Sequence, residues 1–202
     1  MRPLGTLLTR SVAAPLGLGP RAPGGGLLLR DTFTGPDGTA LAAHPMEIGS
    51  GWTVHQGGAA LAANRARLGS LGSGRMVATA SAGRANVAVR LTVNSGGALS
   101  QGLVLRFQDP SNYWLLYVTG AGMTLHEVNA GSFVVRAQRA IALSGGTDYQ
   151  LEAVCAGLTI SATLNGGNPI QYASATHLQT AVRFGLYGEQ VGQQFDQFEV
   201  RP

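Results

Sequence analysis

The sequence predicts an all-β protein, an antiparallel jelly-roll sandwich with a short N-terminal arm. Three observations lead to this prediction. From residue 27 onward, short runs rich in Val, Leu, Thr and aromatic residues recur, clusters of Gly, Asn, Asp and Ser separate them, and no segment shows helical periodicity. About a dozen strands at a spacing of roughly 8–12 residues are typical of a sandwich or barrel. The expected organisation is an arm and linker over residues 1–26 and a jelly-roll body over residues 27–202.

Thirteen segments of the body fit the pattern of a β-strand, at 27–33, 52–56, 65–68, 75–80, 85–93, 102–108, 112–119, 123–129, 132–138, 148–154, 157–164, 181–187 and 195–200. In 85–93, Val87, Val89 and Leu91 share one face, which indicates a strand with one buried side. The run YWLLYV at 113–118 is apolar on both faces, so we expect a central strand that is covered on both sides. Trp52 and Trp114 are expected in the core.

Composition excludes several classes of protein. Charged residues make up 12% of the chain, against about 25% in an average domain, and hydrophobic residues make up 45%. Disorder over most of the chain would require low hydrophobicity and high net charge, and is excluded. Cys155 is the single cysteine, so a disulfide framework is excluded, and we expect it to be a small buried hydrophobic residue. No apolar run reaches the ~18 residues of a spanning helix, so no membrane insertion is expected.

The positive charge lies in the arm. All 14 basic residues are arginine, and four of them precede Asp31, the first acidic residue, so ten arginines stand against ten acidic residues in the body. The arm shows apolar residues at helical spacing near 3–14, and a Pro/Gly-rich linker follows at 15–26. Four arginines in 30 residues are a weak electrostatic footprint, so nucleic acid is not an expected partner.

We expect the arm to dock on a partner chain, because a helix this short is marginal alone and its apolar stripe has no cover. The expected interface residues are Leu4, Leu7, Leu8 and Val12, with Arg2 and Arg10 at the rim. Two alternatives remain open at this point. The arm could fold back on its own body, or its Arg-rich, acid-free composition could mark a mitochondrial transit peptide.

The order of motifs in the body resembles the laminin-G-like form of the concanavalin A-like lectin/glucanase jelly roll. The resemblance begins at Asp31-Thr32-Phe33, continues through Asp37-Gly38-Thr39 and the GWTVHQGG segment, and resumes at LVLRFQDPSNYWLLYV. It closes with VRFGLYG and FDQFEV, and covers roughly residues 30–201. The resemblance implies that the first and last strands pair, which would bring Asp31 near Asp196. Families of this type include carbohydrate-binding modules, glycoside hydrolases and domains of phage structural and cell-surface proteins.

The residues give no support to an enzyme. Glycoside hydrolysis needs two carboxylates about 5–9.5 Å apart across the scissile bond, and the sequence has no E-x-D or E-x-E pair. The four histidines show neither a nucleophile elbow nor metal-ligand spacing. No cofactor is expected. A calcium ion held by Asp31 and Asp196 is a further hypothesis, although two carboxylates do not identify a site and both could instead cap strand ends.

A ligand-binding face is a second hypothesis. Five polar or aromatic residues alternate away from the apolar positions of their strands, namely Arg106, His126, Arg136, Arg183 and Tyr187. If these strands share a sheet, the side chains would line one face, where planar donors and an aromatic ring suit a sugar or a carboxylate. The alternative is an ordinary solvated face, since polar residues on the outside are the default for antiparallel sheets.

The sequence leaves three hypotheses for function. The leading one is a non-enzymatic structural component of a virus particle, a bacteriophage capsid decoration or tail protein. It would be assembled in the host cytoplasm and would dock on other virion proteins or copies of itself through the arm. The second is a carbohydrate-binding, lectin-like module that contacts a cell-surface glycan. The third is a glycoside-active enzyme with an unusual pair of acids.

Overall fold

The computed structural model describes residues 26–94, 99–173 and 175–202. The predicted interface of the arm lies outside these ranges, and comprises Leu4, Leu7, Leu8 and Val12 with Arg2 and Arg10. The described chain is all-β, as predicted: two antiparallel sheets stack face to face, and one short 3-10 helix, η1 (Leu41–Ala43), precedes β2. None of the helices in the described ranges has the length and apolar character that crossing a bilayer requires.

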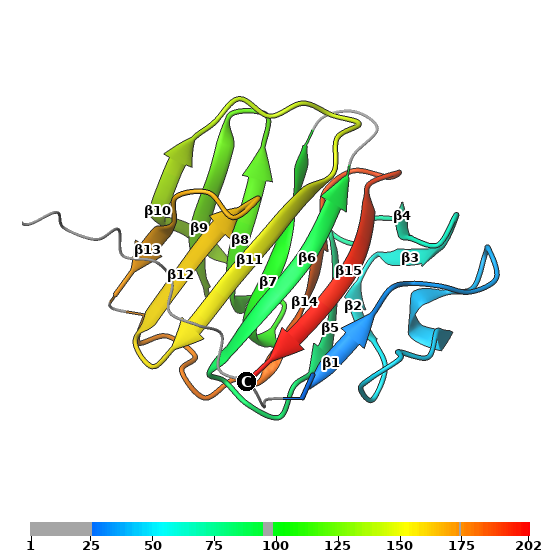
Figure 1. Ribbon diagram of the computed structural model, residues 1–202, viewed down its shortest axis with the longest axis horizontal. Coiled ribbons are helices and arrows are strands. Elements are labelled where there is room, and N and C mark those ends of the chain that lie inside the picture. The colour runs from blue at the N-terminus through cyan, green and yellow to red at the C-terminus, as the bar shows by residue number, and fades with distance from the viewer. Residues whose placement is uncertain (1–25, 95–98, 174) are drawn as a thin grey trace, which may run out of the picture.

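Sheet A has eight strands and lies in front in Figure 1. Its order is β13-β12-β11-β6-β15-β4-β3, with β1 beside β15. The strands span β1 (Leu29–Asp31), β3 (Gly58–Leu61), β4 (Ala66–Ser70), β6 (Val87–Asn94), β11 (Tyr149–Ala156), β12 (Thr159–Leu164), β13 (Ile170–Tyr172) and β15 (Gln194–Arg201).

Sheet B has seven strands in the order β10-β9-β8-β7-β14-β5-β2, and lies behind sheet A in Figure 1. The strands span β2 (Thr53–Gln56), β5 (Met76–Ser81), β7 (Ser100–Asp109), β8 (Asn112–Thr119), β9 (Gly122–Asn129), β10 (Ser132–Ala140) and β14 (Arg183–Gly188). Each of the thirteen predicted segments overlaps one strand. The prediction missed β3 and β13, which are short and follow glycine-rich turns that carry no strand signal of their own.

The main core fills the space between the sheets. Trp52 and Trp114 belong to it, at 5% and 0% exposure, which confirms their prediction as core residues. Strand β6 alternates between buried and half-buried residues as the sequence predicts. Cys155 is buried in this core, and burial raises the pKa of its thiol to about 11. The thiol is therefore protonated at neutral pH and behaves as the small hydrophobic group that was expected.

The carboxylate of Asp31 is wholly buried at the end of β1. It accepts hydrogen bonds from Nε1 of Trp52 at 2.6 Å and from the backbone N of Phe33 at 2.7 Å, and Nε2 of His44 lies 2.9 Å away. These contacts tie the segment after β1 to the start of β2.

The hypothesis of a shared calcium site at Asp31 and Asp196 is not supported. Strand β1 does pair with β15, as the resemblance implied, but Asp31 stands opposite Phe198 and its side chain points into the core. Asp196 pairs with Thr92 of β6. Leu91 and Val93 of that strand point into the core, so Thr92 and Asp196 point the other way, to the outer face of sheet A. Among the described residues, no three His, Cys, Asp or Glu side chains come together as metal ligands.

Candidate functional site

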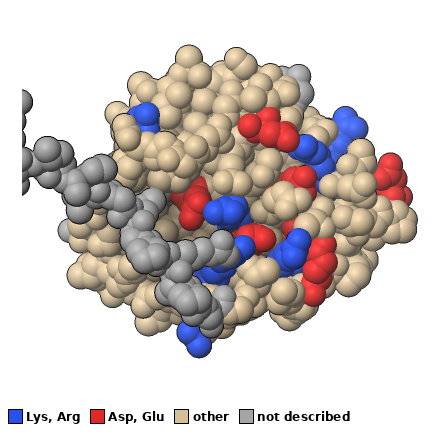
Figure 2. All heavy atoms as spheres, in the orientation of Figure 1, with Lys and Arg blue, Asp and Glu red and all other residues tan. Residues whose placement is uncertain are grey.

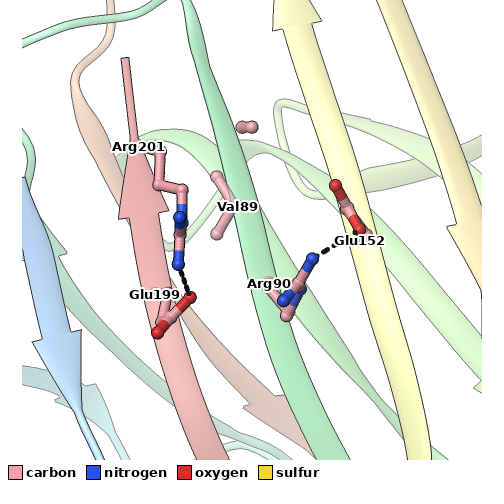
Figure 3. Close-up of a pocket in the computed structure, with 6 residues that line it drawn as sticks. Val89, Arg90, Glu152, Glu199 and Arg201 are labelled. Atoms are coloured by element: carbon pink, nitrogen blue, oxygen red, sulfur yellow. Dashed lines mark hydrogen bonds and ion pairs between the residues drawn. The ribbon is translucent and has the colours of Figure 1, made fainter. Parts of the chain in front are cut away.

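The outer face of sheet A is a polar surface whose charges are matched. Figure 2 shows basic and acidic side chains next to one another across it. In Figure 3, Arg90 contacts Glu152 at 3.2 Å and Arg201 contacts Glu199 at 2.7 Å. The pocket between these pairs has a volume of about 20 Å³, which is enough for one water molecule. This pocket therefore has its charges paired and is too small for an organic ligand.

The outer face of sheet B is different, because a second apolar cluster lies on it, away from the main core. Its members are Val77, Val104, Phe107, Tyr113, Leu115, Val128 and Tyr187, with Tyr117 packed against them. All seven have at most 2% of their surface exposed. Strand β8 is thus buried on both faces, which confirms the prediction made from YWLLYV.

This face is concave, and one contact demonstrates its curvature. The guanidinium carbon of Arg75, the residue before β5, lies 4.9 Å from the centre of the Phe133 ring on β10. Five inter-strand steps separate β5 from β10, which is about 24 Å in a flat sheet and further than the two side chains reach together. Nη1 of Arg75 also donates to the hydroxyl of Tyr113 at 3.4 Å. The sheet must therefore curl toward this side, and we call it the concave face.

A carboxylate held by two tyrosines lies on the concave face. The hydroxyls of Tyr117 and Tyr187 each donate to Glu189 at 2.6 Å, one to each oxygen. Burial and these bonds raise the pKa of both tyrosines far above the usual 10, so each keeps its proton at any physiological pH. The rings of Tyr117 and Tyr187 meet edge to face at 5.9 Å.

The two tyrosines approach each other across Gly102 of β7, which pairs with both of them. A Cβ at Gly102 would overlap the carbonyl oxygen of Leu116. Gly102→Ala should therefore lower the free energy of unfolding by about 1–3 kcal/mol, the usual cost of overpacking. Thermal unfolding measures this, with Gly69→Ala as the matched control, since a Cβ there has only the carbonyl oxygen of Gly58 near it, at 3.8 Å. Equal melting of the two variants would contradict the packing described for Gly102.

A hollow of about 380 Å³ opens at one corner of the concave face, over β8, β9 and β10. By strand register, Thr119, Thr124, Gln138 and Ala140 project into it from the same face as Tyr117. His126 borders the hollow, because its Nε2 lies 2.7 Å from Oγ1 of Thr124. Its ring stands edge to face with Tyr117 at 5.9 Å and with Phe133 at 6.1 Å. Hydroxyls and an amide thus line a space of the size that small ligands occupy, with the His126 ring at its border.

The structure brings together three of the five residues predicted for a binding face. All five belong to sheet B, but only His126, Arg183 and Tyr187 lie on the concave face. Arg106 is wholly buried, and donates to the backbone carbonyls of Gly157, at 2.8 Å, and Ala85 and to the side-chain amide oxygen of Asn86. Arg136 turns to the opposite side, where it contacts Glu127 at 2.9 Å and lies over the ring of Tyr172. The expectation that the five share one face is therefore wrong for these two.

The physical reason is a bulge in each strand. The register of β7 shifts between Leu105 and Asp109, and Arg106 takes a left-handed φ of 46°. The register of β10 shifts between Val135 and Ala137, at Arg136 itself. A bulge inserts one residue and so reverses the alternation beyond it, which a strictly alternating pattern does not anticipate.

Sequence reasoning missed most of the concave face. Tyr113 and Tyr117 were predicted to lie in a strand that is covered on both sides. Their burial agrees with that prediction, but the pattern did not indicate that they lie near a possible ligand site. Phe133 lies at an outward position of β10 and could have been found from the alternation, but Gln138 lies beyond the bulge and could not. Arg75 and Glu189 lie outside the strands, and no periodic pattern could have placed them.

Two histidines on this face should make stability depend on pH. Burial lowers the pKa of His126, and burial followed by the charge of Arg183 lowers that of His55, both from the usual 6.5. Below pH 6.5 the unfolded chain therefore binds protons that the folded protein does not, so stability falls as pH falls from 6.5 through the lowered values. The melting temperature should drop between pH 7 and pH 5, and less so in the double variant His55→Gln, His126→Gln. An equal drop in that variant would assign the effect to other groups.

No protein-family model matches the sequence, and no curated protein matches it. Solved structures are similar in fold. The carbohydrate-binding module CBM66 from Bacillus subtilis has 17% identity and a TM-score of 0.66, over 76% of this chain and 96% of that one. Domain 4 of AbnA, a GH43 extracellular arabinanase from Geobacillus stearothermophilus in complex with arabinotriose, has 12% identity and a TM-score of 0.61, over 88% and 92%. Xylan β-1,4-xylosidase from Bacillus halodurans C-125 has 13% identity and a TM-score of 0.56, over 71% and 34%.

At these identities the similarity shows a shared fold. It confirms the lectin-type β-sandwich that the motif order implied. All three structures come from carbohydrate-active proteins, so the comparison gives no support to the virion role, which was the leading hypothesis from the sequence.

Proposed function

We propose that this protein is a carbohydrate-binding module, and that the hollow on the concave face of sheet B holds the glycan. The observation that carries the proposal is the hollow itself: about 380 Å³ of space on a face whose middle is filled by buried apolar and aromatic side chains. The similar folds of CBM66 and of the AbnA domain favour this function over the other two hypotheses. Fold similarity alone does not assign a function, so the weight of the proposal lies on the residues.

The chemistry around the hollow suits a sugar. Thr119, Thr124 and Gln138 supply hydroxyl and amide groups that both donate and accept, as sugar hydroxyls require. Tyr117 and His126, both half-buried at the border, add ring surface on which the C–H face of a sugar can pack. Burial lowers the pKa of His126, so the imidazole is neutral at pH 7 and keeps one donor and one acceptor nitrogen.

Binding without turnover is part of the proposal. Among the described residues of the concave face, Glu189 supplies a carboxylate near the hollow, and both of its oxygens already accept hydrogen bonds from tyrosines. Glycoside hydrolysis by the usual route needs a second carboxylate about 5–9.5 Å away. Glu189 instead fixes the orientation of Tyr117 at the border of the hollow.

A glycan array followed by calorimetry tests the proposal. The double variant Thr124→Val, Gln138→Ala should weaken the binding of any glycan that the wild type retains by about tenfold or more, which is about 1.4 kcal/mol per factor of ten. Gln171→Ala on β13 is the control, since that exposed glutamine lies on sheet A. An array on which the full chain retains no glycan would overturn the proposal, as would a double variant that binds like the wild type.

Docking through the arm stays a prediction, because its residues lie outside the described ranges. Deletion of 1–26 should leave the melting temperature of the body unchanged and remove binding to a partner chain, since the body has its own core. A virion location and virion partners likewise rest on the sequence hypothesis alone.

A further inference from the structure

Strand β10 is a long exposed edge of sheet B. It ends the sheet in Figure 1, and β9 is the one described strand that pairs with it. It has nine residues, whereas the other terminal strands of the two sheets, β2, β3 and β13, have three or four. An edge strand presents main-chain groups to which another strand can bond, and proteins commonly keep such edges short or charged. Of the edges in this fold, β10 is therefore the one best suited to pair with another strand.

The first half of β10 is also apolar. Phe133, Val134 and Val135 are exposed to 38%, 40% and 47%. The charged residues of the strand, Arg136 and Arg139, come only at the bulge and beyond it. By alternation, Phe133 and Val135 project from the concave face and Val134 from the opposite one. Three neighbouring apolar side chains thus contact water on an edge that carries no charge of its own.

The β9–β10 turn shows which main-chain groups point to the open edge. Its two residues, Ala130 and Gly131, have positive φ values of 48° and 79°, as in a two-residue type I′ hairpin. The pair that flanks such a turn is hydrogen-bonded, so Ser132 bonds to β9. The N–H and C=O groups alternate in direction along a strand, so those of Phe133 and Val135 point away from β9. Two donors and two acceptors therefore face the edge in the apolar half of β10.

We propose that β10 pairs with β10 of a second copy of this chain, in an antiparallel ladder centred on Val134. In this register Phe133 lies opposite the partner's Val135, and Val134 lies opposite its own copy. Phe133 and the partner's Val135 exchange two hydrogen bonds, and the two-fold axis repeats the exchange, so all the outward groups are paired. The three apolar side chains of each copy are covered by the same three of the other.

The residues of β10 select this register. Centring on Phe133 would place Val135 opposite the partner's turn, and centring on Val135 would place Phe133 beyond the partner's bulge, where the main-chain alternation is broken. Centring on Arg136 would place two like charges directly opposite each other, which is destabilising. At Val134 the segment is complementary to itself, as the interface of a two-fold dimer requires.

The interface is small, because it consists of one short ladder and three apolar side chains from each copy. We therefore expect a reversible equilibrium between monomer and dimer, with a Kd on the order of micromolar. The hollow stays outside the ladder, since Gln138 and Ala140 lie beyond the bulge. The inference thus does not depend on the proposed function, and the dimer is tested without any glycan.

Sedimentation equilibrium of the full chain tests the dimer. The average mass should rise from monomer toward dimer between about 1 and about 500 μM, on both sides of the expected Kd. Val134→Lys places two positive charges opposite each other and should raise the Kd at least about tenfold. Val154→Lys is the matched control, because Val154 is exposed to 41% but lies on β11, which has strands on both sides. Unchanged thermal melting verifies that both variants are folded.

Two results would overturn the inference. One is a monomer at every concentration. The other is a dimer whose Kd is the same in Val134→Lys as in the wild type, which would place the interface elsewhere, for example in residues 1–26.

A cysteine variant tests the register. In Val134→Cys the two new thiols would face each other across the two-fold axis, at a Cα separation of about 4.5–5.5 Å, which a disulfide spans. Oxidation should therefore convert most of the protein to a covalent dimer on a non-reducing gel. Val191→Cys is the control, because Val191 is more exposed, at 64%, but lies between β14 and β15, and Cys155 is buried in both variants. Equal cross-linking of the two variants would reflect random collision and would contradict the proposed register.

Discussion

Trp114→Ala should lower the stability of the protein more than Arg106→Ala or Gly102→Ala. The indole has no exposed surface, donates from Nε1 to the carbonyl of His177 at 2.9 Å, and packs beside Tyr172 from the opposite sheet at 5.8 Å. Removing a buried indole typically costs about 3–5 kcal/mol. For a chain of this size that corresponds to a fall in Tm of roughly 10 °C, which thermal unfolding followed by circular dichroism would detect.

Trp114→Phe is the matched control, because it keeps an aromatic ring in the core and should recover much of the loss. Glycan binding by folded Trp114→Ala protein should be unchanged, since Trp114 lies on the face of β8 opposite to the hollow. A variant that kept its Tm and lost glycan binding would reverse this assignment and make Trp114 a stacking platform for sugars.

Arg106→Ala should have the second-largest effect. The buried guanidinium joins the loop before β6, at Ala85 and Asn86, to the β11–β12 turn at Gly157, through three hydrogen bonds of 2.8–3.4 Å. Asn86 and Gly157 are exposed, so water can replace the guanidinium at these acceptors, and the loss is that of hydrogen bonds made by a charged group, about 1.5–3 kcal/mol. Urea unfolding measures this loss, which should be smaller than that of Trp114→Ala.

This variant also separates a structural role of Arg106 from the ligand-binding role that the sequence suggested. Below its melting temperature, Arg106→Ala should bind glycans like the wild type. Arg183→Ala is the informative comparison, because Arg183 is only half-buried on the concave face and should cost less stability. If Arg106→Ala melted like the wild type and failed to bind glycans, Arg106 would be a ligand-binding residue and its assignment to a structural role would be wrong.

The strands could be predicted from the sequence because local signals specify them. The apolar residues Val87, Val89 and Leu91 alternate with a period of two, which identifies a strand without knowledge of its neighbours in the sheet. The turn-forming residues after Phe107 and Leu164 end their strands by local conformational preference, without contacts to distant residues. The burial of Cys155 and Trp52 followed from the same patterns. The motif order then pointed to the correct type of sandwich.

The candidate site could be predicted only in part. His126 and Tyr187 were placed on the right face because no bulge interrupts the register of β9 with β8 or of β14 with β5. Arg106 and Arg136 were misplaced because a bulge beside each reversed the direction of the side chain. Glu189 could not have been connected with Tyr117, 72 residues away, since that hydrogen bond exists only after the sheet has formed.

The sequence by itself therefore determined the all-β class, the positions of most strands and the two-sided burial of β8, because each depends on the periodicity of neighbouring residues. Only the tertiary structure decided which outer face is concave and where it stays open. Curvature brings Arg75 to Phe133 across five strand spacings, and the bulges select which arginines leave that face. Both are properties of a curved and twisted sheet, and the free energy that fixes them comes from contacts between residues far apart in the chain.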